Sequence, residues 1–71
     1  MSSFHGLMKI HHSYQKMEAM RDYQKIINHC KEVGREDLIE AFPLKEGYGT
    51  KRIDNQSAKI IIALKEAGLP F

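Results

Sequence analysis

The sequence has few of the residues that cross-link, break or anchor a small fold. It contains one cysteine, two prolines and no tryptophan in 71 residues. The single cysteine, Cys30, cannot form an internal disulfide, which predicts a chain held together by packing and favours a reducing, cytoplasmic location. No apolar run reaches the length of a membrane-spanning helix, so we expect no membrane partner.

Strand-like patterns and a large net charge are also missing. No stretch alternates apolar and polar residues as a half-buried strand does. With 42% hydrophobic residues, 28% charged residues and a net charge of +2, the composition is typical of one globular domain over residues 1–71. The charge is too mildly basic to indicate nucleic-acid binding on its own. We therefore expect a single all-α domain of marginal stability, because a chain this short buries only about 60% of its surface.

Four helices are expected, packed as a small four-helix bundle. The apolar residues of the first half recur at too short a step for one straight helix, so we place a break at His11 to Ser13, where Ser13 can cap a new helix. Gly34 and Gly68 suit the left-handed turn past a helix end, and Asp54 suits the start of the last helix. The expected helices span about 3–11, 14–33, 35–42 and 54–67, with a loop at 43–53.

Helical spacing also predicts which residues form the core. The second helix is expected to bury Met17, Met20, Tyr23, Ile27 and Cys30. The last helix is expected to bury Ser57, Ile60, Ile61, Leu64 and Ala67. Ile62 falls on the opposite side of this helix among polar residues, so it must be covered by a partner, left in water, or covered by the N-terminal helix through Phe4, Leu7 and Met8.

No pattern typical of an enzyme, a metal site or a cofactor site is found. The histidines and Cys30 lack the spacing of zinc ligands, and a thiol on a buried helix face has a high pKa and poor access. The segment Gly47 to Thr50 lacks the third glycine and the lysine of a phosphate-binding loop. Glu36, Asp37 and Glu40 recur at helical spacing and indicate a solvated face. We therefore expect a non-enzymatic protein with no catalytic residue, no metal and no cofactor.

Two hypotheses for function remain open. In the first, the chain is a small binding protein, namely a regulator, inhibitor or adaptor, that contacts another protein, or itself as a homodimer. The contact would use the last helix and the loop before it. Its centre would be Ile62 and Ala58, and its rim Tyr48, Lys51, Lys59 and Lys65.

In the second hypothesis, the chain is a small DNA-binding regulator with a helix-turn-helix-like arrangement. Lys51 and Arg52 would bind phosphate near the N-terminus of the last helix. Asn55, Gln56 and Lys59 would follow on its exposed side, where amide side chains can pair with adenine. The connection over 43–53 is, however, far longer than the three or four residues of the usual turn.

Overall fold

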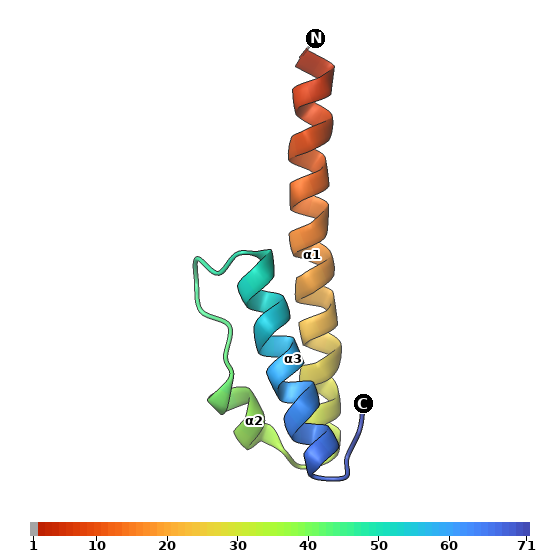
Figure 1. The fold of residues 1–71 in the computed structure, drawn as a ribbon, viewed down its shortest axis with the longest axis vertical. Helices are drawn as coiled ribbons and strands as arrows, with labels where there is room; N and C mark the ends of the chain where they lie inside the picture. Colours follow the sequence, from red (N-terminus) through yellow and green to blue (C-terminus); the bar gives the residue numbers. More distant parts are fainter. Residues whose placement is uncertain (1) are drawn as a thin grey trace.

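The computed structural model describes the backbone of residues 2–71 and the side chains of residues 14–71. Three helices follow one another in this part of the chain, which contains no strand: α1 (Ser2–Glu32), α2 (Glu36–Ala41) and α3 (Thr50–Glu66). α1 and α3 run side by side in the same direction, and α2 with the loop after it returns the chain to the start of α3 (Figure 1). None of the described helices combines the length and the apolar character needed to cross a bilayer.

The predicted break at His11 to Ser13 is wrong, and three helices replace the expected four-helix bundle. The expected helices 3–11 and 14–33 are one continuous helix, α1, which gives the molecule its long dimension of 51 Å. Tyr14, Met17 and Met20, which produce the apparent drift, are 61%, 54% and 49% exposed and do not belong to the core. The residues that α1 buries fit a single straight stripe at spacings of four, three and four: Ala19, Tyr23, Ile26 and Cys30.

α3 begins at Thr50, four residues before the predicted start at Asp54. Gly49 is the N-cap residue and its carbonyl accepts the first helical hydrogen bond, from the N–H of Ile53 at 3.1 Å. The additional turn brings Ile53 into the core, and burial of this isoleucine accounts for the earlier start better than a capping preference at Asp54 does. The buried residues of α3 are Ile53, Ser57, Ile60 and Leu64, again spaced by four, three and four.

The predicted ends of the two long helices are confirmed. Gly34 and Gly68 adopt positive φ angles of 73° and 76°, which residues with a Cβ rarely adopt. After each glycine, the next N–H returns to a carbonyl in the last helical turn. Arg35 donates to Cys30 at 2.8 Å, and Leu69 donates to Leu64 at 2.8 Å. Both ends are therefore Schellman-type terminations that satisfy carbonyls of the last turn.

The core lies between the buried stripes of α1 and α3, and Leu38 of α2 closes it. Two hydrogen bonds fix the segment that connects α2 to α3. The hydroxyl of Tyr23 donates to the carbonyl of Phe42 at 2.8 Å, and the side-chain amide of Gln56 donates to the carbonyl of Pro43 at 2.9 Å. The connecting segment is thereby held against one side of the helix pair, and the opposite side of α3 remains open.

Candidate functional site

The outer side of α3 carries a second line of residues, each one position after a residue of the buried stripe. This line consists of Asp54, Ala58, Ile61 and Lys65, and all four side chains are exposed. Ile62 lies beside it, one turn after Ala58. We refer to Ala58, Ile61 and Ile62 as the outer stripe. α3 therefore has two apolar sides, of which the described part of the chain buries only one.

Both isoleucines of the outer stripe are accessible to solvent. Ile62 is 57% exposed, as its position on the helix predicted. The alternative, cover by Phe4, Leu7 and Met8, depends on side chains that lie outside the described residues. Ile61 is 38% exposed and Ala67 is also exposed, so their predicted places in the core are wrong. The buried residues Ile53, Ser57, Ile60 and Leu64 lie within about 60° of one another around the helix, and Ile61 lies about 70° from the middle of this narrow stripe. Ala67 follows the last residue of α3.

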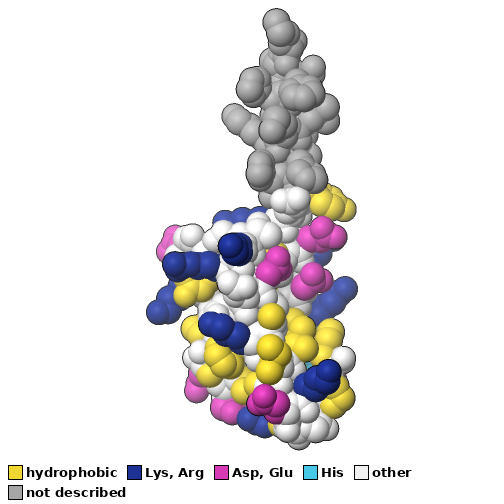
Figure 2. Space-filling model, in the orientation of Figure 1, with side chains coloured by type: hydrophobic (Ala, Val, Ile, Leu, Met, Phe, Trp, Pro, Cys, Tyr) yellow, Lys and Arg dark blue, Asp and Glu magenta, His cyan; other side chains and the backbone are white. Residues whose placement is uncertain are grey.

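The charged surroundings of the outer stripe match the predicted rim in part. Lys59 and Lys65 lie three residues before and after Ile62, and both are exposed. In Figure 2, hydrophobic side chains gather over the lower half of the described molecule, where Figure 1 places the C-terminal half of α3, and charged side chains surround them. Tyr48 is not part of this surface, because it lies half-buried against the core in the connecting loop.

Tyr48 instead lines a shallow hollow of about 210 Å³ with most of the residues proposed to bind nucleic acid. The lining residues are Tyr48, Arg52, Asn55, Gln56 and Lys59. The guanidinium of Arg52 lies 5.3 Å from the centre of the Tyr48 ring, within range of a cation–π contact. The amide of Gln56 already donates to a backbone carbonyl. Lys51 is exposed but does not line the hollow, so the structure gathers four of the five predicted residues.

The N-terminus of α3 is positively charged. Its first turn contains Lys51 and Arg52 and no acidic residue, and Gly49 supplies no side-chain cap. Free N–H groups and the helix dipole add to these two charges, so the helix start is attractive to anions. The two cations belong to the helix itself rather than preceding it as predicted, because α3 starts at Thr50.

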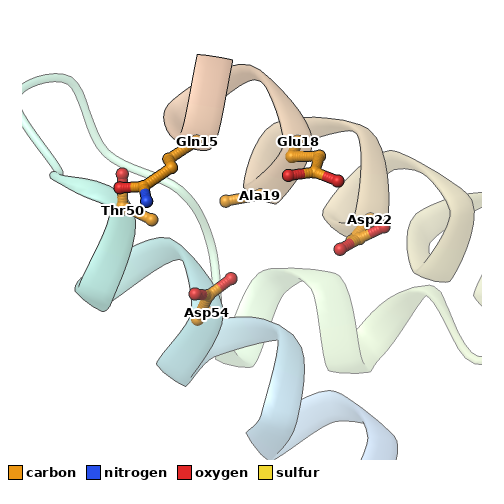
Figure 3. Close-up of a pocket in the computed structure, with 6 residues that line it drawn as sticks. All are labelled: Gln15, Glu18, Ala19, Asp22, Thr50 and Asp54. Carbon is orange, nitrogen blue, oxygen red and sulfur yellow. The ribbon is translucent and has the colours of Figure 1, made fainter. Parts of the chain in front are cut away.

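A polar hollow of about 450 Å³ lies on the seam between α1 and α3. Figure 3 shows Glu18 and Asp22 of α1 across from Asp54 of α3, with Gln15 beside Thr50 at one end. The described residues contain no group of three or more His, Cys, Asp or Glu side chains placed to hold a metal ion. The carboxylates of Glu18, Asp22 and Asp54 give this seam a negative charge. The sequence did not predict this cluster, because it depends on the parallel pairing of two helices.

A third, more apolar hollow of about 280 Å³ borders the outer stripe. Its lining residues are Asp22, Lys25, Ile26, Asp54, Ser57, Ala58, Ile61 and Phe71. The exposed ring of Phe71 packs edge-on against His29 with 5.3 Å between ring centres, and the Nε2 atom of His29 lies 3.1 Å from the carbonyl of Leu69. These contacts hold the C-terminal segment beside α1. No sequence signal indicated Phe71, because its position follows from the fold of the segment after Gly68.

The remaining candidate groups have structural surroundings. Cys30 is fully buried, and burial raises the pKa of its thiol, as expected for a core residue. Glu36, Asp37 and Glu40 are exposed. Arg35 donates two hydrogen bonds to Asp37, at 3.0 and 3.1 Å, and these hold the pKa of the Asp37 carboxyl below its usual range.

No protein-family model, curated protein or solved structure matches this chain. Its function is therefore inferred from the geometry and chemistry of its own residues. The outer stripe combines exposed apolar side chains with the regular backbone of a helix.

Proposed function

We propose that this chain is a non-enzymatic binding protein, namely a regulator, inhibitor or adaptor, that contacts another protein chain through the outer side of α3. The observation that supports this proposal is the exposure of Ile61 and Ile62 on a helix whose other side is fully packed. Burying apolar surface stabilises a complex by roughly 25 cal/mol per Å². The exposed surface of these two neighbouring isoleucines can therefore contribute to binding without weakening the core.

The chemistry of this surface resembles the usual anatomy of a protein interface. An apolar centre, the outer stripe, is bordered by the exposed charges of Lys59, Lys65 and Asp54. The stripe lies on a regular helix, so little backbone entropy is lost when a partner binds. Pairing with another helix or insertion into a groove are the recognition modes open to such a surface. Tyr48 would take part only in a complex that also reaches across Lys59 to the connecting loop.

A capture experiment with two matched variants tests this proposal. Ile62→Asp places a charge in the outer stripe, and Met17→Asp makes the same change at an exposed apolar residue of α1. We expect Ile62→Asp to lose the bound protein while keeping the unfolding midpoint, and Met17→Asp to keep both. Retained binding by Ile62→Asp, or equal losses in the two variants, would refute a contact through α3.

Nucleic-acid binding is the second candidate, and one observation favours it. Arg52, Asn55 and Lys59 share a hollow with the ring of Tyr48, next to a helix start that carries no acidic side chain. Cations at a helix N-terminus can bind phosphate, and an aromatic ring can stack on a base. The Gln56 amide would have to release its backbone carbonyl to read a base, which makes this candidate the weaker one.

A salt series separates this candidate from the first. Binding to a duplex and to a single strand is measured for the wild type and for Lys51→Ala and Arg52→Ala. Each phosphate contact that is removed is expected to lower the slope of log affinity against log salt by about one. An absence of binding at low salt would eliminate the second candidate.

A further inference from the structure

We propose that the partner of the outer stripe is a second copy of this chain, bound so that the two α3 helices pack antiparallel across a two-fold axis. This inference rests on the proposed function, because it names the partner of the same surface. It is supported by a pattern on α3 that is complementary to itself. Along the outer side, an acidic residue, Asp54, is followed by the apolar Ala58 and Ile61 and then by a basic residue, Lys65.

The spacing of these residues suits a paired helix. Asp54, Ala58, Ile61 and Lys65 are separated by four, three and four residues, the same spacing that α3 uses against α1. Such a series forms a nearly straight seam along a helix. Asp54 and Lys65 are eleven residues apart, or about 16 Å at 1.5 Å per residue.

A two-fold axis midway between Asp54 and Lys65 brings opposite charges together. In the antiparallel arrangement, the carboxylate of Asp54 faces Lys65 of the second copy at both ends of the seam, and Ala58 faces Ile61 near the centre. A parallel arrangement would instead place Asp54 against Asp54 and Lys65 against Lys65, which is unfavourable. The charges therefore select the antiparallel pair, and a two-fold contact of this kind closes on itself as a dimer.

The surface beside the seam has room for the second helix. Ala58 is small and exposed, which allows a close approach of two helices at the middle of the seam. The apolar hollow of about 280 Å³ next to it is lined by Ile26, Ile61 and Phe71, and can receive an isoleucine of the second copy. Asp22 and Asp54 also line this hollow and face the incoming Lys65, while Lys25 lies on the same rim.

The contact area limits the strength of this dimer. One pair of helices contacting over about three turns buries less surface than a standard stable interface. We therefore expect self-association in the micromolar range or weaker, with the charges determining orientation more than affinity.

Sedimentation equilibrium over a concentration series, with paired charge reversals, tests the inference. Asp54→Lys and Lys65→Asp are each expected to weaken self-association by about tenfold, because two exposed ion pairs become two like-charge contacts. An equimolar mixture of the two variants is expected to associate as tightly as the wild type, because each copy then offers the charges that the other lacks. Lys45→Asp, the same reversal in the exposed loop, is the control and should associate normally.

Two results would overturn the inference: a wild-type chain that stays monomeric at millimolar concentration, or a mixture of the two variants that associates no better than each alone. These failures are distinct from failure of the proposed function. A monomeric wild type whose Ile62→Asp variant loses a different protein refutes only the self-pairing. An Ile62→Asp variant that captures like the wild type, together with charge reversals that leave association unchanged, refutes the contact through α3 altogether.

Discussion

Ile60 and Ile62 are identical side chains two positions apart on α3, and truncating each to alanine compares the two sides of the helix. Ile60 is fully buried in the core between α1 and α3. We expect Ile60→Ala to lower the free energy of unfolding by about 3 to 4 kcal/mol, because it removes transfer free energy and leaves a cavity. This is a large part of the total stability of a domain of this size, which is roughly 4 to 10 kcal/mol.

For Ile62→Ala the expected change is much smaller. Ile62 is 57% exposed, so folding removes less than half of its surface from water. The lost transfer free energy is therefore below about 1 kcal/mol, and the better helix propensity of alanine returns about 0.4 kcal/mol. The net change should lie within about 0.5 kcal/mol, and the two variants should differ in Tm by roughly 10 to 20 °C.

Urea unfolding followed by far-UV circular dichroism measures both variants. The measurement belongs at low protein concentration, where a dimer contributes nothing to stability. A loss of more than about 2 kcal/mol in Ile62→Ala under these conditions would refute the reasoning that the fold leaves this residue uncovered. An unaffected Ile60→Ala would refute the position of the core.

Three further predictions concern the fold and its polar groups. Ser57→Ala should raise the free energy of unfolding by about 1 kcal/mol, because the buried hydroxyl makes no hydrogen bond and alanine favours the helix. A clear loss of stability in urea would show that the hydroxyl has a partner. Tyr23→Phe should cost about 1 to 2 kcal/mol by leaving the carbonyl at the end of α2 without its donor, whereas Tyr14→Phe, at an exposed residue, should leave the unfolding midpoint unchanged. Arg35 depresses the folded-state pKa of Asp37, so this pair stabilises the fold above the ordinary carboxyl pKa. This stabilisation is lost as the pH falls through the depressed value, so the difference in unfolding free energy between wild type and Asp37→Asn should shrink over that acidic range. A difference that does not change with pH would contradict the prediction.

The parts of the fold that the sequence predicts are those decided within one turn of the chain. Gly34 and Gly68 end α1 and α3 because the left-handed turn past a helix requires little more than a glycine. The outward position of Ile62 is likewise a property of helical geometry and needs no knowledge of the rest of the fold.

The predictions are wrong where packing between helices determines the helix boundary or the buried residue. Asp54 is a good capping residue, but burial of Ile53 against α1 favours a helix that starts at Thr50. Met17 and Met20 are as apolar as core residues, yet the smaller Ala19 takes the buried position where the helices meet. Local preference cannot distinguish these choices, because each depends on which face of α1 receives α3.

The exposure of the proposed contact residues follows from the sequence, whereas the surfaces that border them do not. Ile62, Ala58 and Lys65 lie on one exposed side of α3 as the sequence indicated. Ile61 does not lie in the core as predicted, because the buried stripe of α3 is narrower than the apolar face that the sequence indicates. The acidic seam and the apolar hollow combine residues from α1, α3 and the C-terminal segment, so they become visible only in the folded chain.

Site-directed photo-crosslinking tests most directly whether the outer side of α3 is where this protein binds another chain. A photoreactive residue replaces Ile62 in one sample and Met17, the exposed apolar residue of α1, in the other. We expect position 62 to give a covalent adduct with a protein, of twice the monomer mass if the partner is a second copy, and position 17 to give none. Adducts from position 17 alone, or none from position 62 at concentrations where binding occurs, would contradict a contact surface on α3.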